Sequence, residues 1–282
     1  MPKLKLSNEE LNNILIDYNN GMSMSGITKK YHHDKNTLKK YFIEHNINIH
    51  IRNKSESLSC SQEKKKSDLL KRSYMVNDNY FSSQNNKMAY FLGFIMADGN
   101  VAKNSNRIQI CLAEKDSEFL ELFYKEIGGT PVAHYFARKG TQPICRWECL
   151  SSKIKKDLSI YGIIPHKTGF AKIPNTLKKE FYSDFIRGYF DGDGNIWIEK
   201  NGAAGFGITS HNPEILQQII DYFEERDIPP VKINIDNRSN INYSFKYRKQ
   251  AIKKIYKILY YDKEIFYLKR KFDKFNEILL KK

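Results

Sequence analysis

Two short stretches of this chain share one unusual pattern, an apolar run that ends in Asp-Gly. They are residues 91–99 and 186–194. Residues four apart lie on the same face of a helix, and each stretch has small residues at that spacing. These small residues are Gly93, Ala97, Gly188 and Gly192. Because a helix face without bulk lets another backbone approach closely, we predict that the two stretches form helices packed against each other.

Such packing would bring two acidic residues to the same end of the helix pair. Asp98 and Asp193 each follow the small face of their own stretch. Two carboxylates repel each other, and a helix C-terminus is also the negative end of its dipole. A hard divalent cation with oxygen ligands offsets both effects and carries phosphate oxygens alongside. The pattern therefore predicts a metal-dependent site that cleaves phosphodiesters.

The overall charge predicts a polyanionic partner or an anionic membrane surface. Lys and Arg number 47 against 32 acidic residues, which gives a net charge of +15. The apolar runs are too short to span a bilayer, and the N-terminus lacks a signal-peptide core, so we expect an intracellular, cytoplasmic and nucleoid-associated protein without a membrane partner. The four cysteines show no metal-site spacing and are expected to be reduced thiols.

Residues 1–50 are predicted to form a small all-α domain with three helices. Ser7 and Glu10 have capping-box spacing at the start of the first helix, and the others are expected at about 24–31 and 35–44. This spacing resembles the helix-turn-helix of recombinases and transcription regulators, in which the third helix enters the major groove. Its outward residues would then bind DNA: Lys35, Asn36, Thr37, Lys39 and Lys40. The alternative is a helical domain with a solvated charged face.

Residues 51–73 read as a polar, lysine-rich linker, and the rest divides into two similar halves, 74–178 and 179–282. Each half is predicted to have the order αββαββα, beginning with its Asp-Gly helix. The first half has predicted strands at about 107–112, 132–138 and 144–150 and helices at 117–127 and 153–161. The second has predicted strands at about 205–209, 231–237 and 241–247 and helices at 213–226 and 250–260.

Alternation in the later strands predicts a sheet with one helix-covered face and one polar face. The inward residues would be Val231, Ile233, Ile235, Ile241, Tyr243, Phe245 and Tyr247. Solvation alone explains such a polar face, whereas the net charge favours a nucleic-acid surface, because an antiparallel ribbon fits the major groove. The predicted DNA-binding residues on the sheets are Arg107, Gln109, Lys232, Asn234, Arg238, Lys246 and Arg248.

The two Asp-Gly stretches resemble the nine-residue motif of the LAGLIDADG homing endonucleases. Positions three, eight and nine are Gly, Asp and Gly in both copies, whereas position six is Met96 in one and Asp191 in the other. The resemblance implies an α+β fold of two pseudo-symmetric halves with a saddle-shaped antiparallel sheet surface. It also implies a monomeric, site-specific double-strand DNA endonuclease that uses Mg²⁺, with Mn²⁺ as a substitute, and makes staggered cuts with 3′ overhangs at a long asymmetric target.

The resemblance also assigns roles to individual residues. The metal site is expected at Asp98 and Asp193 with the flanking residues Ala97, Gly99, Gly192 and Gly194. Each half is expected to close with a loop that carries a lysine, at residues 161–168 and 266–271. Lys167, in a Gly-x-x-Pro-x-Lys-Thr context, and Lys271 are expected there to polarise water or neutralise phosphate charge. Lys269 and Arg270 compete with Lys271 for this role. Ser210 fits a polar strand-end position that Ala113 occupies in the first half. His166 and His211 are expected at the surface or just behind the residues that contact the metal.

Two alternatives remain open at the level of sequence. A DNA-binding transcription regulator with the same fold need not cleave, although such regulators have lost acids that this chain retains. A maturase would use the same surface for intron RNA. The chain neither opens with Cys or Ser nor ends in His-Asn, so we expect a free-standing or intron-encoded protein rather than a self-splicing intein.

Overall fold

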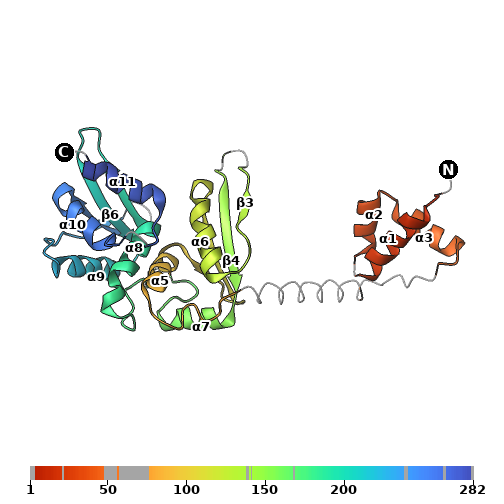
Figure 1. Cartoon of the computed structure of the whole chain (residues 1–282), viewed down its shortest axis with the longest axis horizontal. Coiled ribbons are helices and arrows are strands. Elements are labelled where there is room, and N and C mark those ends of the chain that lie inside the picture. Colours follow the sequence, from red (N-terminus) through yellow and green to blue (C-terminus); the bar gives the residue numbers. More distant parts are fainter. Residues whose placement is uncertain are drawn as a thin grey trace. The chain divides into compact units, whose positions relative to one another are not determined.

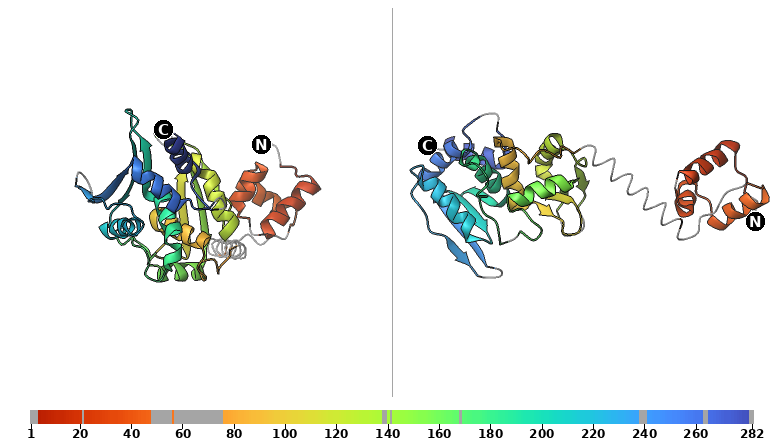
Figure 2. Two further views of the ribbon diagram at one scale, coloured as in Figure 1. Left: turned by 60° about the vertical axis from the view of Figure 1, so that its left-hand side comes forward. Right: turned by 90° about the horizontal axis from the view of Figure 1, so that it is seen from below.

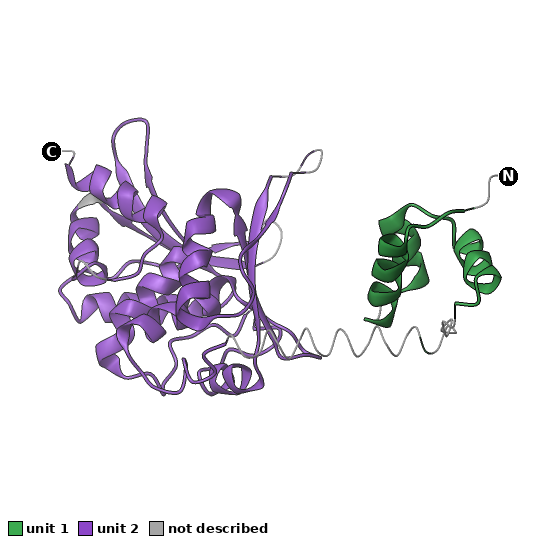
Figure 3. Cartoon of the chain, turned by 45° about the vertical axis from the view of Figure 1, so that its right-hand side comes forward, with its two compact units in different colours: residues 1–71 green, residues 72–282 purple. Residues whose placement is uncertain are grey.

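The chain contains two compact units, residues 1–71 and residues 72–282 (Figures 1 and 3). The computed structural model describes residues 4–20, 22–47, 56, 76–137, 140, 142–167, 169–237, 241–262 and 265–280. Apart from Glu56, the predicted linker lies outside the described residues.

The N-terminal unit is a bundle of three short helices. These are α1 (Asn8–Asn19), α2 (Met24–Tyr31) and α3 (Lys35–Glu44), as predicted. Ser7, Ser23 and Asp34 cap them by accepting hydrogen bonds from backbone N–H groups of the first turn. Their apolar faces meet in a small core of Ile14, Tyr18, Met24, Ile27, Leu38 and Phe42.

The predicted capping box of α1 is only half formed among the described contacts. The backbone N–H of Glu10 donates to Oγ of Ser7 at 3.1 Å. The Glu10 carboxylate instead lies 2.9 Å from Nε2 of His33. Glu10 thereby connects the first helix to the turn before the third, which a local pattern could not predict.

In the larger unit, two helices cross at its centre. They are α5 (Asn86–Asp98) and α8 (Tyr182–Asp193), which contain the two Asp-Gly stretches (Figure 1). A methyl carbon placed on Gly93 would lie 2.0 Å from the carbonyl oxygen of Phe185, and one on Gly188 would lie 1.9 Å from that of Tyr90. The predicted contact between small faces is confirmed, because only glycine allows backbones to approach so closely.

The first half of the larger unit follows the predicted order αββαββα, and the second half follows it with one further helix. After α5 come β1 (Asn100–Val101), β2 (Arg107–Ala113), the 3₁₀ turn η1 (Glu114–Asp116), α6 (Ser117–Ile127), β3 (Ala133–Tyr135), β4 (Ile144–Leu150) and α7 (Ser152–Ile160). The turn η2 (Lys179–Phe181) precedes α8, followed by β5 (Gly194–Ile198), β6 (Ala204–Ser210), α9 (Pro213–Glu224), β7 (Asn234–Asp236), β8 (Asn242–Arg248), α10 (Lys249–Leu259) and α11 (Lys269–Leu280).

The strands form two four-stranded antiparallel sheets with equivalent connectivity. Their orders are β1-β2-β4-β3 and β5-β6-β8-β7, and the views in Figure 2 show the helices packed on them. In the first sheet, Ile108, Ile110, Cys145 and Trp147 are buried, whereas the residues between them are exposed or half-buried. The fold is therefore α+β with two pseudo-symmetric halves, as the sequence predicted.

The second hairpin of the second half differs from its predicted pattern. Strand β7 has only three residues, and Ile235 is exposed, as is Ile241 just before β8. Both were predicted to point inward. Phe245 and Tyr247 are buried as predicted, because they lie where β8 pairs with β6 over the core. The far end of the hairpin extends past the helices, so alternation there does not correspond to burial.

Two further boundaries required correction. Strand β3 is shorter than predicted, and the segment predicted as a lysine-bearing loop around Lys271 is the start of α11. This last helix buries Phe275 and Ile278. Lys271 is therefore held on a helix rather than in a flexible turn.

Candidate metal and nucleic-acid site

Asp98 and Asp193 are the last residues of the two crossing helices. Both residues are exposed, so their carboxylates can be reached from solvent. A methyl carbon on Gly192 would lie 2.3 Å from the Ala97 Cβ atom and 3.4 Å from an Asp98 carboxylate oxygen. Asp98 thus lies against the residue that precedes Asp193, and the helix crossing brings the two acids together.

The proximity of the acids changes their titration. The pKa of Asp193 is raised to about 6, first because protein displaces water around its carboxylate and then because Asp98 is a like charge. Reduced hydration also raises the pKa of Asp98, although the cations of Lys271, Lys167 and Arg270 oppose that rise. A pair of acids that resists ionisation is a pair that a bound cation would stabilise.

Lys167 and Lys271 both donate to carbonyl groups at the ends of the motif helices. Nζ of Lys167 lies 2.9 Å from the Ala97 carbonyl oxygen. Nζ of Lys271 donates to the carbonyls of Phe190, Asp191 and Gly194 at 2.6, 2.8 and 2.6 Å. Burial lowers the pKa of Lys167 and lowers that of Lys271 to about 8. Both lysines therefore neutralise the negative ends of the two helix dipoles.

The neighbouring residues differ between the halves. In the second half, the Tyr189 hydroxyl donates to Oγ of Ser210 at 3.1 Å, and both residues are buried. In the first half, Phe94 holds motif position four and Ala113 ends β2, so neither of these positions provides a hydroxyl. The two pockets beside the acids are chemically different.

Position six of the second motif is buried rather than part of the open site. The Asp191 carboxylate accepts hydrogen bonds from the Tyr90 hydroxyl and the Leu268 backbone N–H, both at 2.8 Å. Burial raises its pKa to about 6. Asp191 therefore connects α8 to α5 and to the segment before α11. This agrees with the sequence-based inference that position six takes no part in the chemistry that the two motifs share.

A metal ion fits this arrangement only if oxygen ligands from another molecule complete its coordination. Within the described residues there is no group of three or more His, Cys, Asp or Glu side chains that could enclose a cation. Mg²⁺ commonly takes one or two protein carboxylates together with substrate phosphates and water. The open carboxylate pair, with the raised pKa of Asp193, agrees with this mode of binding.

The predicted DNA-binding residues of the sheets lie on the polar faces with differing local partners. Arg107, Lys232, Asn234, Lys246 and Arg248 are exposed, and Gln109 is half-buried. Arg248 pairs with Glu199 at 2.7 Å. Arg238 lies outside the described residues. A hollow of about 410 Å³ on this face of the second sheet is lined in part by Lys246, Thr209 and Asn195.

Sequence reasoning missed two residues of the polar faces. Arg146 on β4 alternates with the buried Cys145 and Trp147, and its guanidinium lies 4.8 Å from the centre of the Tyr135 ring. Trp197 on β5 packs over Gly205, where a methyl carbon would lie 2.2 Å from its ring. The alternation around Arg146 was a usable signal, whereas Trp197 belongs to a strand that was not predicted.

The predicted recognition residues of the N-terminal unit lie on α3. Lys35, Asn36, Thr37 and Lys40 are exposed, and Lys39 is half-buried. Thr37 also contributes to the cap, because its hydroxyl donates to Asp34 at 3.2 Å. Most of these side chains are thus exposed on α3, and one of them also has a structural role.

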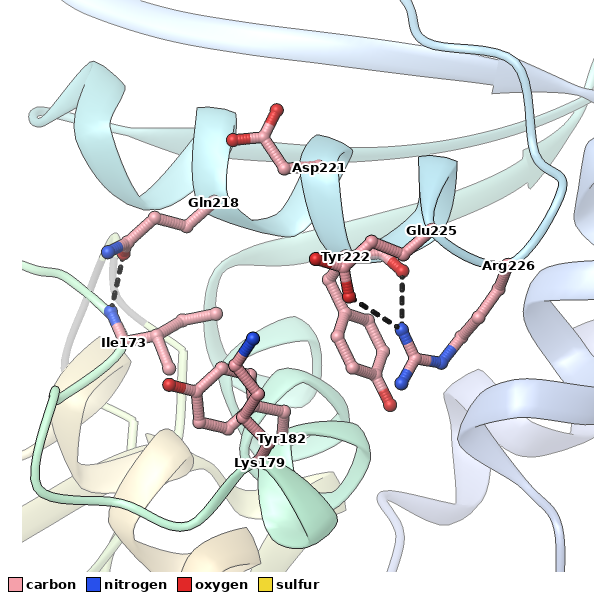
Figure 4. A pocket seen from close by; sticks show the side chains of 8 residues that line it. All are labelled: Ile173, Lys179, Tyr182, Gln218, Asp221, Tyr222, Glu225 and Arg226. Atoms are coloured by element: carbon pink, nitrogen blue, oxygen red, sulfur yellow. Dashed lines mark hydrogen bonds and ion pairs between the residues drawn. The ribbon is translucent and has the colours of Figure 1, made fainter.

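A separate cavity of about 150 Å³ lies beside α9 and η2 (Figure 4). Arg226 there lies 3.6 Å from the centre of the Tyr222 ring, and Gln218 accepts from the backbone of Ile173 at 2.7 Å. Neither motif acid lines it. No helix in the described ranges has the length and apolar character that a bilayer crossing requires.

These features define a class of protein in which one chain contains two similar αββαββα halves, joined by glycine-rich helices that end in acids. The LAGLIDADG-like domain family matches residues 85–125 and 180–268, which include both motif helices. The chain belongs to the LAGLIDADG family.

Comparisons with solved structures and curated proteins give further similarities. Meganuclease I-SmaMI bound to uncleaveable DNA matches with a TM-score of 0.48 and 16% identity, over 70% of this chain and 88% of that one. The I-LtrWI LAGLIDADG homing endonuclease bound to target DNA matches with a TM-score of 0.42 and 14% identity, over 72% and 90%. DNA-directed RNA polymerase subunit Rpo1C of Methanocaldococcus jannaschii is 24% identical over 164 residues, which span 57% of this chain but only 18% of that protein.

Proposed function

We propose that this protein is a site-specific double-strand DNA endonuclease that acts as a monomer. The observation that carries the proposal is the placement of Asp98 and Asp193 side by side at the ends of two crossing helices, open to solvent. One chain supplies both acids, so one molecule has the residues for two cuts. The solved relatives described as bound to DNA support the same substrate.

The polar faces of the two sheets are the proposed DNA surface. Antiparallel strands fit the major groove, in which every base pair presents a distinct pattern of donors and acceptors. Exposed cations such as Arg107 and Lys246 would contact phosphates or base edges. Because the halves differ in sequence at these positions, the proposed target is long and asymmetric. The exposed face of α3 would extend that target.

Asp98 and Asp193, with the flanking Ala97, Gly99, Gly192 and Gly194, are the proposed holders of Mg²⁺, for which Mn²⁺ could substitute. When bound, such a cation supplies a lowered pKa for water and neutralises phosphate charge. In the hydrolysis that we propose, the oxygen of water bonds to phosphorus as the bond from phosphorus to O3′ breaks. The product ends are a 5′-phosphate and a 3′-hydroxyl, which takes up a proton.

Lys167 and Lys271 have a proposed role in the same pocket. Their ammonium groups hold the carbonyls at the helix ends and lower the negative potential around both acids. We propose that the lysines, as ammonium ions, favour the ionised acids and offset the charge that develops on the scissile phosphate.

The test is incubation of the purified full chain with a randomised duplex library, first with Mg²⁺ and then with Ca²⁺. An endonuclease will cut a defined subset of sequences with Mg²⁺ and bind the same subset uncut with Ca²⁺. Binding without cutting under both conditions would identify a regulator. Preference for structured RNA over every duplex would identify a maturase.

A further inference from the structure

One arginine of the second half of the larger unit forms an ion pair with an acid of the first half. Arg270 lies in the first turn of α11, and its Nε donates to both carboxylate oxygens of Asp116 at 3.0 Å. Asp116 ends the η1 turn and is only 6% exposed. The Arg270 side chain is 46% exposed. The buried Asp116 carboxylate therefore binds the Nε atom of Arg270, while the outer end of the guanidinium reaches solvent.

The cavity beside Asp98 contains this guanidinium. It has a volume of about 510 Å³ and is lined by residues that include Asp98, Ala113, Asp116 and Arg270. Asp98 and Arg270 therefore face the same space. Among the described residues, no hydrogen bond occupies the Nη atoms of Arg270. These Nη atoms carry the N–H groups with which a guanidinium binds phosphate oxygens.

The second half has a different arrangement at the corresponding place. There, the hydroxyls of Tyr189 and Ser210 lie together at the strand end, whereas the first half has Phe94 and Ala113. A phosphate beside Asp98 would lack a hydroxyl donor from either position. Arg270 lines the cavity beside Asp98 and is a charged donor that could take their place, and Asp116 orients it.

We propose that Arg270 is a further catalytic residue, which binds a non-bridging oxygen of the scissile phosphate beside Asp98 and acts on that DNA strand alone. This inference rests on the proposed endonuclease function. A guanidinium fixed before substrate arrives stabilises charge that develops on the phosphate without reorganisation. The two strands are then cut by unlike sets of residues.

The experiment measures the cutting rate of each strand, using a selected target duplex with a different fluorophore on each strand. Arg270→Met alone would leave Asp116 buried without its partner, so the informative variant is Arg270→Met with Asp116→Asn. Lys274→Met is the matched control, because it removes a cation from the same helix that pairs only with Glu277 in the described contacts. The double variant should cut one strand about 100-fold more slowly and the other at the wild-type rate.

Two measurements distinguish this role from a structural one. Thermal unfolding should give a similar Tm for the double variant and the control, and affinity for the target in Ca²⁺ should fall by less than the cutting rate. Equal slowing of both strands, or no slowing of either, overturns the inference while leaving the proposed function intact. If the wild-type chain cuts neither strand of any duplex, the proposed function fails and the inference fails with it.

Discussion

Gly93 and Phe185 are in backbone contact, and a methyl carbon on the glycine would lie 2.0 Å from the carbonyl oxygen of the phenylalanine. Gly188 makes the reciprocal contact with Tyr90. Nonbonded carbon and oxygen atoms cannot remain so close, so any side chain at either glycine must separate the helices. The placement of both motif acids depends on this pair of contacts.

Gly93→Ala should therefore lower the free energy of unfolding by about 3 kcal/mol, because the clash is with backbone and cannot be relieved by a rotamer change. Urea denaturation followed by circular dichroism measures the loss. Gly162→Ala is the control, because its φ is 79° and its Cβ would meet nothing within 4 Å. That variant should cost about 1 kcal/mol through backbone strain alone. Equal losses for both variants would contradict close packing at Gly93.

Asp98→Asn and Asp193→Asn should each reduce double-strand cutting on the order of 1,000-fold, because the amide carries no charge to hold a cation. Binding in Ca²⁺-free buffer should change little, since the polar sheet faces are untouched. Linearisation of a plasmid that contains the target measures cutting, and fluorescence anisotropy measures binding. Wild-type linearisation by either variant would remove that acid from the proposed site.

The raised pKa of Asp193 predicts how metal affinity depends on pH. As pH rises through about 6, Asp193 loses its proton and the carboxylate pair gains the charge that attracts a cation. Affinity for Mn²⁺, measured by electron paramagnetic resonance, should therefore increase between about pH 5 and 7. In Asp193→Asn the increase in this window should be much smaller. An affinity that is constant from pH 5 to 7 would show that Asp193 is not a ligand.

The raised pKa of Asp193 also affects stability in the absence of metal. Metal affinity should increase as pH rises, whereas stability should decrease. The folded-state pKa lies above the ordinary value of 3.8, so the contribution of Asp193 to stability is fully present below about pH 4 and lost as pH rises through about 6. Asp193→Asn should unfold at a higher Tm than the wild type at pH 7.5. At pH 4 the two should be similar. Differential scanning calorimetry tests both, and a lower Tm for the variant at pH 7.5 would contradict the repulsion.

Deletion of residues 1–50 should shorten the DNase footprint at one end of the target. The two units have separate hydrophobic cores, so removal of the three helices takes away the α3 face and leaves the core residues of the larger unit in place. Cutting by the remaining chain should continue at higher protein concentration. A footprint of unchanged length would show that α3 does not contact the target and that its charged face is only solvated.

Affinity for the target should fall steeply with salt, because each phosphate contact releases a counterion. The slope of log affinity against log salt changes by about 0.9 per contact. Lys246→Gln, on the polar face of β8, should reduce the slope by about 1. Lys253→Gln, on an exposed position of α10, should leave it unchanged. Identical slopes for the two variants would argue against the sheet face as the DNA surface.

Several parts of the fold were predictable because local patterns determine them. The helix at residues 117–127 and the strand at 144–150 have the predicted bounds, since periodic apolar residues define both and Gly128 and Gly129 end the helix. Strand β1 was not located, because two residues carry no periodicity. Helix α11 was missed although Phe272, Phe275 and Ile278 recur at helical spacing, because the family resemblance had suggested a loop there.

The site was predictable where one motif contained the information. The two acids and the lysines near them followed from the paired motifs and the resemblance. The ion pair between Arg270 and Asp116 did not, because it joins residues far apart in sequence and depends on where α11 packs. The partners of Lys271 were likewise unpredictable, since they are backbone carbonyls that become available only at a helix end.

The reciprocal glycine contacts are of the kind by which two identical subunits meet across a two-fold axis, each presenting the same patch to the other. Covalent fusion of the two sides removes any need for them to remain identical. Each half can then acquire substitutions suited to its own stretch of nucleic acid, while the glycine contacts between α5 and α8 are kept. A chimera that joins one half of this chain to a half from a relative should assemble, provided that its glycines match.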